Sequence, residues 1–370
     1  MAGRSHAAVR PTPRLTRARV ARGLVASALV VVGIVASAPA AHAHAVTGVK
    51  ATNYKSEIVG ISGPAGPVDV RLLDLGRRIE LVNRGRADIV VLGYAGEPWL
   101  RVGPRGGFEN EYSNSAYLER QRPGQASGPP PDPAKASGPP RWRKTGDDNT
   151  IIWRDRRTRF EGPAPDQVQR APGQGHPVVP RWTVELLRGQ APLAIEGRIS
   201  YVPPPSPVSW ALIAIVLFVA TALTVHFARR PWVVGHCLAL LVAVDVVHSF
   251  ANAAISGGSQ AKQAGGVLRG GSLGVLAWVL GAGAVWMLGR RTELGIILGG
   301  SSALMIAVYG GVTDAAALAS SQVPSALSPF LMRAAVTLSL GLGFGIALPL
   351  AYEGMRGSTV DAPRPKTPRR

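Results

Sequence analysis

The C-terminal part of this chain contains five long apolar segments that follow one another with only short polar breaks. A helix of about twenty apolar residues is long enough to span the ~30 Å hydrocarbon core of a bilayer. The pattern therefore predicts an all-α bundle of five transmembrane helices between residues 208 and 353. We place them at residues 208–228, 232–251, 267–288, 294–312 and 330–352.

Residues 44–202 show a different pattern, in which hydrophobic and polar residues alternate with a period of two. The alternation is clearest in residues 68–72, 78–81, 182–186 and 193–201. Short alternating runs between glycines and prolines are typical of antiparallel strands with one buried face. We therefore expect an all-β domain, an Ig-like sandwich, ahead of the helices.

Two segments interrupt the alternating pattern. Residues 122–140 contain Ser-Gly-Pro-Pro twice, and residues 162–180 are similarly rich in Gly and Pro. Such composition favours extended, disordered loops. Between them, Thr150–Trp153 is expected to form a strand, and the proline-rich residues 203–207 a stiff link to the membrane.

One further segment, Gly93–Val102, mixes aromatic residues with glycines. Two interpretations fit this composition. The segment forms either a binding surface or a buried aromatic corner of the sandwich, and we favour the buried corner.

The N-terminus has the three parts of a secretory signal: a basic start, the apolar run Gly23–Ala38 and the small-residue site Ala41-His42-Ala43. This predicts a signal peptide over residues 1–43 and export of the sandwich, with His44 as the new N-terminus. Cleavage after Ala40 and an uncleaved membrane anchor are the alternatives.

The formal net charge of +19 comes largely from basic residues beside apolar segments. Such clusters are topology signals, so we do not expect nucleic-acid binding. With the sandwich outside, the arginines at 229–230 and 290–291 and the basic tail 354–370 all face the cytoplasm. The chain is thus predicted to be a multi-pass plasma-membrane protein with an extracytoplasmic sandwich and a cytoplasmic C-terminus. The terminal clusters are Arg4, Arg10, Arg14, Arg17, Arg19, Arg22, Arg356, Arg364, Lys366, Arg369 and Arg370.

Glycines recur at small-xxx-small spacing within the spans, as in Gly295 with Gly299 and Gly341 with Gly345. This spacing lets helix backbones approach closely. It predicts one compact bundle, with homo-oligomerisation through the same faces as the alternative.

The sequence contains no signature of a common enzyme class. Its one cysteine, Cys237, lies in a predicted span, so the exported domain has no disulfide. No zinc-ligand spacing, phosphate-binding glycine loop or nucleophile elbow occurs. We therefore expect a protein that is not an enzyme.

Two histidines are candidate metal ligands. A free α-amino group and an imidazole on His44 would together suit Cu(II), which accepts nitrogen donors. His176 is the other histidine that falls within the predicted exported domain. The alternative is a terminal histidine left by chance.

A second candidate site lies in the membrane. At about 100° per residue, Asp245, His248 and Asn252 share one stripe of the second span with Cys237. A central Asp costs ~2.5–3.5 kcal/mol on insertion scales, and such residues commonly mark function. The alternative is a structural hydrogen-bonded pair, in which the Asp245 carboxylate accepts from the His248 imidazole at i+3 or from a donor on another helix. Arg333 on the fifth span is the most attractive donor of the second kind.

Two short motifs, Ala43-His44-Ala45 and Asp245–Ala251, resemble the copper-resistance families CopC and CopD, which occur fused as a sandwich followed by a helical membrane domain. The resemblance implies a CopC-like sandwich and copper handling. The chain departs from these families in its five spans, its longer exported domain and the lack of an Asp and His near His44 to complete the copper site. As a whole it is similar to actinobacterial proteins that combine a signal, a sandwich and a membrane domain, which implies no activity.

Two hypotheses follow. In the favoured one, the protein is an envelope interaction or structural component whose sandwich binds an envelope protein or polymer, with the spans as anchor in the lipid bilayer. In the other, it binds, takes up or senses copper through His44 and the polar stripe.

Overall fold

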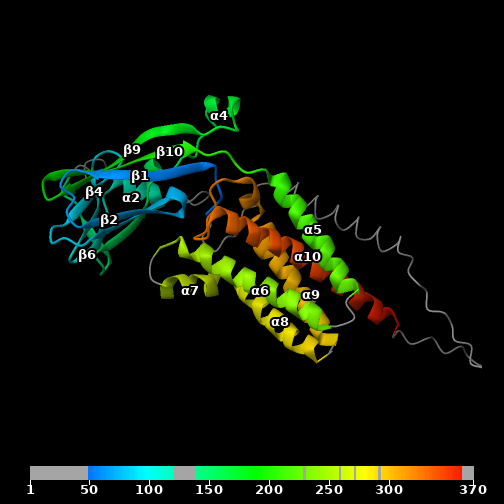
Figure 1. Cartoon of the computed structure of the whole chain (residues 1–370). Coiled ribbons are helices and arrows are strands. Elements are labelled where there is room, and N and C mark those ends of the chain that lie inside the picture. The colour runs from blue at the N-terminus through cyan, green and yellow to red at the C-terminus, as the bar shows by residue number, and fades with distance from the viewer. Residues whose placement is uncertain are drawn as a thin grey trace, which may run out of the picture.

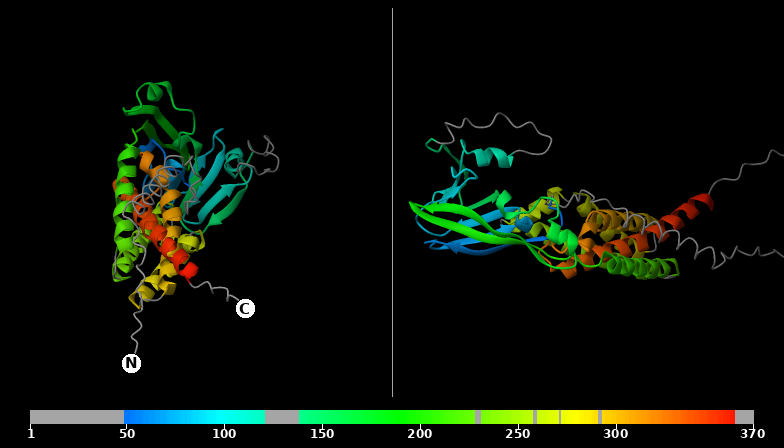
Figure 2. Two further views of the ribbon diagram at one scale, coloured as in Figure 1. Left: turned by 90° about the vertical axis from the view of Figure 1, so that its right-hand side faces the viewer. Right: turned by 90° about the horizontal axis from the view of Figure 1, so that it is seen from above.

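The computed structural model describes residues 49–120, 138–227, 231–257, 260–270, 272–290 and 293–360. A β region comes first and a helical region follows, and the two lie end to end (Figures 1 and 2). The predicted signal peptide, His44, nearly all of the 122–140 loop and the end of the basic tail lie outside the described residues.

The β region consists of two antiparallel sheets, which confirms a sandwich-like arrangement. The larger sheet has the strand order β1-β10-β9-β4-β5-β6-β7, and the smaller has the order β2-β3-β8. The strands of the larger sheet are β1 (Tyr54–Ser62), β10 (Ala191–Tyr201), β9 (His176–Arg188), β4 (Ile89–Leu92), β5 (Pro98–Gly103), β6 (Gly106–Asn110) and β7 (Trp142–Gly146). Those of the smaller are β2 (Val68–Leu73), β3 (Arg78–Asn83) and β8 (Thr150–Arg154).

The period-two alternation explains how the two sheets share one core. On β3, Ile79 and Leu81 point inward, and on β9 and β10 Val184 and Ile195 do the same; all four are fully or almost fully buried. Because side chains alternate across a strand, the intervening polar residues lie on the other face. Three tryptophans, Trp99, Trp153 and Trp182, complete this core.

The Gly- and Pro-rich residues 162–180 differ from expectation, because they are not one loop. They contain the short helix α4 (Asp166–Arg170) and the first residues of β9. Strand β10 runs on to Tyr201, which pairs with His176, so β10 supplies the backbone partners that extend β9. The Tyr201 hydroxyl also donates to the Pro172 carbonyl at 3.0 Å.

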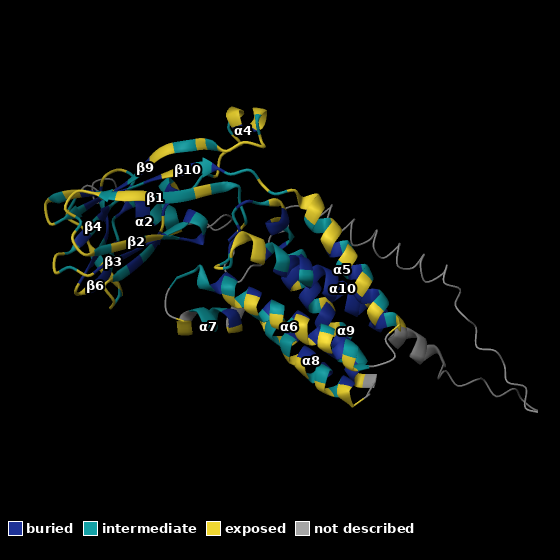
Figure 3. Ribbon diagram, in the orientation of Figure 1, coloured by how far each residue is buried: buried dark blue, intermediate teal, exposed yellow. Residues whose placement is uncertain are grey.

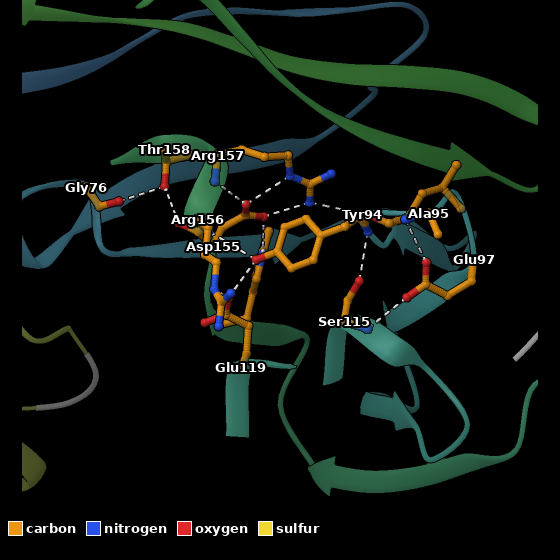
Figure 4. A network of polar contacts seen from close by, with 12 residues as sticks. Gly76, Tyr94, Ala95, Glu97, Ser115, Glu119, Asp155, Arg156, Arg157 and Thr158 are labelled. Atoms are coloured by element: carbon orange, nitrogen blue, oxygen red, sulfur yellow. Dashed lines mark hydrogen bonds and ion pairs between the residues drawn. The ribbon is translucent and has the colours of Figure 1, made fainter. Parts of the chain in front are cut away.

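The Gly93–Val102 segment forms the β4–β5 turn and strand β5, in agreement with a buried aromatic corner. Trp99 is 2% exposed, and its ring centroid lies 5.6 Å from that of Tyr94. The Tyr94 hydroxyl donates to Glu119 Oε1 at 2.7 Å and accepts from the Arg156 backbone N–H at 3.0 Å (Figure 4). Burial raises the pKa of the Tyr94 phenol, and the charge of Asp155 raises it further.

A buried carboxylate closes the same corner. Glu97 accepts from the Ser115 N–H and the Ser113 hydroxyl, both at 2.9 Å, and from the Ala95 N–H at 3.1 Å. Ser115 lies at the start of helix α2 (Asn114–Arg120). The carboxylate thus ties the β4–β5 turn to α2, which gives this corner a structural role (Figure 4).

Five helices of the C-terminal region are long and apolar enough to cross a membrane. They are α5 (Pro207–Phe227), α6 (Pro231–Ala254), α8 (Ser272–Gly289), α9 (Glu293–Ile306) with its π-helical extension Ala307–Val312, and α10 (Pro329–Val360). The third span begins at Ser272 and not at residue 267, because the preceding residues belong to a separate helix, α7 (Gln260–Gly270). The α7 sequence contains Arg269 within the residues first assigned to the span, and Gln260 and Gln263 before them, so it is more polar than the apolar helix that follows.

The surface of the bundle is suited to lipid. Among the described residues that precede α5, Val59 is the one large exposed hydrophobic residue. Many large hydrophobic residues are exposed on the outer faces of the five long helices (Figure 3). Most of α10 is buried, so it forms the centre of the bundle. Such an outer surface indicates a membrane-spanning protein.

Glycines allow α5 and α10 to pack closely, as their spacing predicted. A Cβ atom on Gly341 would lie 2.6 Å from the Leu217 Cβ. One on Gly345 would lie 2.7 Å from the Thr221 Cβ and 3.0 Å from the Phe218 carbonyl oxygen. Any larger residue at these two positions would force the helices apart.

Candidate functional site: a polar cavity within the helical bundle

A cavity of about 420 Å³ lies among α6, α8 and the π-helical end of α9. It occupies the half of the bundle nearest the sandwich, since α6 ends and α8 begins there. Its lining includes the buried polar residues Asp245, His248, Asn252 and Asp314, the hydroxyl-bearing residues Ser249, Ser272 and Thr313, and the aromatic residues Trp278 and Tyr309. The predicted polar stripe therefore faces a cavity inside the bundle and not the lipid.

The α6 stripe arises from helical geometry. Asp245, His248 and Asn252 are spaced three and four residues apart, so they share one face of the helix. They are 3%, 2% and 4% exposed, respectively. Cys237 is half-buried among the apolar residues of the bundle and does not line this cavity.

His248 pairs with a residue that the sequence did not single out. Its Nε2 lies 2.6 Å from Oδ2 of Asp314, and Asn252 Nδ2 donates to the same oxygen at 3.3 Å. Asp314 falls between the fourth and fifth predicted spans, and it is 8% exposed. The π-helical turn Ala307–Val312 precedes it, and such turns occur frequently at functional sites.

Asp245 is held by α8. The Trp278 indole N–H donates to its Oδ2 at 2.7 Å. Its other oxygen lies against Gly310, where a Cβ atom would be 2.1 Å from Oδ1. Sequence reasoning missed both neighbours, because a tryptophan and a glycine in apolar segments are ordinary membrane residues.

The expected ion pair between Asp245 and Arg333 is not present. Arg333 instead donates to the carbonyl oxygens of Ala317 and Ser320, at 3.1 and 2.7 Å. It lies near the start of α10, level with the α9–α10 connection, and so it caps that connection. The prediction was wrong because helix order alone did not reveal which neighbour faces Asp245.

Two polar atoms on the α6 face of the cavity have unused hydrogen-bonding capacity. Within the described part of the chain, His248 Nδ1 and Asn252 Oδ1 are buried without a hydrogen-bond partner. None of the described lining residues is Lys or Arg, whereas two are Asp. The geometry therefore favours a ligand that donates hydrogen bonds and carries positive charge.

The cavity is connected to the sandwich through the α9–α10 connection. Gln322 and Thr52 exchange two backbone hydrogen bonds, of 2.8 and 3.0 Å, and the Ser321 N–H donates to Asn53 Oδ1 at 2.9 Å. The short 3-10 helix Ala315–Ala319 joins Asp314 to these residues. One connection thus contacts His248 at its start and the sandwich at its end.

A second contact joins the β2–β3 turn to the end of α6. Arg78 Nη2 donates to the Ser256 carbonyl at 2.9 Å, and Arg78 is also paired with Asp74. Gly257 lies against Leu73, where a Cβ atom would approach its side chain to 2.7 Å. Asp74 itself has a φ of 53°, a left-handed conformation that this ion pair helps to hold.

His176, the second histidine considered as a metal ligand, is engaged by neighbouring groups. His176 Nε2 bonds to the Ala171 carbonyl oxygen at 2.9 Å, and its ring stacks on Tyr201. No group of three His, Cys, Asp or Glu side chains able to hold a metal occurs among the residues described. His44 lies outside them, so copper binding there stays a prediction.

Comparison with known proteins identifies no relative: no protein-family model, curated protein or solved structure matches this chain.

Proposed function

We propose that this protein is an envelope interaction component whose extracytoplasmic sandwich binds an envelope protein or polymer, with the helical bundle holding it at the plasma membrane. The observation that carries the proposal is the double hydrogen bond between Thr52 and Gln322. A domain that is merely anchored needs one helix and a flexible linker. This sandwich instead docks its backbone onto the bundle.

The docking supports a role in which a force on the sandwich, or the binding of a partner to it, is transmitted to the helical bundle. Strand β1 begins next to Thr52, and it is the edge strand of the larger sheet. A partner that adds to this edge or covers β1 would act directly on the α9–α10 connection. That connection leads to Asp314, so the polar cavity lies at the far end of the same path.

The positions of the arginines support the extracytoplasmic placement. Arg290 follows the end of α8 farthest from the sandwich, and in the sequence the arginines at 229–230 come between α5 and α6. Positive residues are retained on the cytoplasmic side. This orientation puts the sandwich outside the cell.

Photo-crosslinking in living cells tests the proposal. A photoreactive amino acid at Val59, which is 68% exposed on β1, should give a discrete adduct with an envelope component. The same group at Leu240, an exposed residue of the α6 face, serves as the lipid-facing control and should not. Arg154 on β8 and Arg181 on β9 are two further exposed positions at which the photoreactive group is placed. If a well-expressed protein gives no adduct from Val59, Arg154 or Arg181, the interaction role is overturned.

A further inference from the structure

We infer that the cavity within the bundle binds a small organic cation that has a primary ammonium group and an apolar body. This inference rests on the cavity alone and does not depend on the proposed role of the sandwich. Charge, hydrogen bonding and shape each support it independently.

The first argument is charge. Asp245 and Asp314 contribute two buried carboxyl groups, and no Lys or Arg is among the described lining residues. Their internal partners are neutral or weakly basic donors: the Trp278 indole, the Asn252 amide and the His248 imidazole. Buried negative charge without a full counter-charge is costly in a membrane. A bound cation would offset that cost.

The second argument is the direction of the hydrogen bonds. His248 Nε2 lies 2.6 Å from Asp314 Oδ2 and 3.1 Å from Asn252 Nδ2. His248 Nδ1 is buried without a partner among the described residues, and it accepts hydrogen bonds in the tautomer whose proton is on Nε2. Asn252 Oδ1 is a second unpartnered acceptor on the same helix face. A primary ammonium offers three N–H donors, which matches this set of acceptors.

The third argument is size and shape. A volume of about 420 Å³ falls in the range of small-molecule sites and far exceeds that of a bare metal ion. Leu273, Met305, Tyr309 and Trp278 give the cavity an apolar and aromatic part, beside the hydroxyls of Ser249, Ser272 and Thr313. Aromatic rings attract organic cations, and the apolar residues accommodate a hydrocarbon body. The ligand is therefore amphipathic.

Two sources can present this chemistry. One is a soluble amine, and the other is the ethanolamine head group of a membrane lipid. Leu273 and Tyr309, which line the cavity, are also exposed on the surface of the bundle. The cavity is thus accessible from its membrane-facing side, and the shared feature of both ligands is the primary ammonium group.

Calorimetry on the full-length protein in phosphatidylcholine nanodiscs tests the inference. The probe is 2-phenylethylammonium, and its neutral analogue 2-phenylethanol and its trimethylated analogue are the comparisons. Loss of the charge, or of the N–H donors alone, should weaken binding about tenfold or more. Asp245→Asn and Asp314→Asn should each weaken binding of the ammonium probe by a similar factor.

A matched pair of glycine variants separates loss of binding from loss of folding. Gly274 lines the cavity on α8 and has open space around its Cβ position, so Gly274→Leu would occupy part of the cavity while leaving its polar residues in the sequence. Gly289, at the other end of α8, has similar open space but does not line the cavity. Gly274→Leu should abolish binding, while Gly289→Leu should bind as the wild type does.

A lipid arm distinguishes the sources. If the head group is the ligand, phosphatidylethanolamine in the nanodisc should compete with the soluble probe, and native mass spectrometry should retain that lipid on the wild type but not on Gly274→Leu. If a soluble amine is the ligand, the lipid should not compete. The inference is overturned if the ammonium probe binds no better than 2-phenylethanol and phosphatidylethanolamine is not retained, or if Gly274→Leu leaves all binding intact.

Discussion

His248 and Asp314 lie 66 residues apart in the chain, yet their side chains meet at 2.6 Å inside the bundle. His248 belongs to α6, whereas Asp314 begins the connection that runs to the sandwich. The pair therefore fixes one end of the path whose other end is the backbone pairing of Thr52 with Gln322.

Removing the Asp314 carboxylate should weaken the connection that runs from His248 to the sandwich. Asp314→Ala removes the buried carboxylate that His248 and Asn252 both contact, so we expect it to lower the free energy of unfolding by about 1–3 kcal/mol. Hydrogen exchange should rise in residues 315–322. Ser320→Ala is the control, because its exposed hydroxyl bonds only within its own turn, to the Ala316 carbonyl at 2.9 Å. Unchanged exchange in Asp314→Ala would contradict the path.

Close packing of α5 on α10 gives a second test. Gly345→Val would place a Cβ atom 3.0 Å from the Phe218 carbonyl oxygen, which is backbone and cannot move aside alone. Overpacking of this kind typically costs about 1–3 kcal/mol, so thermal unfolding in detergent should occur at lower temperature. Gly283→Ala is the control, since its Cβ would meet only the Leu298 side chain at 3.9 Å. Equal stability of the two variants would rule out the tight interface.

Acid should weaken the corner around Glu97. Burial acts to raise the pKa of this carboxyl, but the hydrogen bonds from Ser115 and Ser113 outweigh it and hold the pKa below its ordinary value of 4.5. A folded-state pKa lower than that of the unfolded chain stabilises the fold above the unfolded value, and this contribution disappears as pH falls through the folded value. Hydrogen exchange in residues 93–118 should therefore increase below about pH 4.5.

Glu97→Gln is the matching variant, because an amide is almost the same size but does not ionise. It should raise exchange in residues 93–118 at neutral pH and remove the acid-dependent increase. If the variant keeps the wild-type pH profile, another group governs the acid response of this corner.

Copper at His44 is a prediction of the sequence that the described residues do not test. If the α-amino group and imidazole of His44 form the site, the protein cleaved after Ala43 should bind Cu(II), and His44→Ala or one added residue before His44 should abolish tight binding. His176→Ala should have no effect, because that ring is engaged by Ala171 and Tyr201. Calorimetry with Cu(II) measures all four proteins. Equal affinity of His44→Ala and wild type would exclude the site.

The order of the two regions could be predicted from sequence because each has a strong local period. Alternation at residues 182–186 indicated a strand, and the spacing of Asp245, His248 and Asn252 indicated one buried helix face, as observed. The partners Trp278 and Asp314 could not be predicted, because they depend on how helices pack and not on any local pattern. Arg333 was misassigned for the same reason.

The junction between the regions gives the last prediction. Gln322→Pro removes the backbone N–H that donates to the Thr52 carbonyl at 2.8 Å, whereas Gln322→Ala keeps it. If the pairing joins the sandwich to the bundle, calorimetry on wild type and Gln322→Ala should show a single cooperative transition, and Gln322→Pro should show two, with the sandwich unfolding separately. In cells, Gln322→Pro should still give the Val59 crosslink, because β1 itself is intact. Two transitions in the wild type would mean that the sandwich is only tethered, and the proposed transmission to Asp314 would then have no physical route.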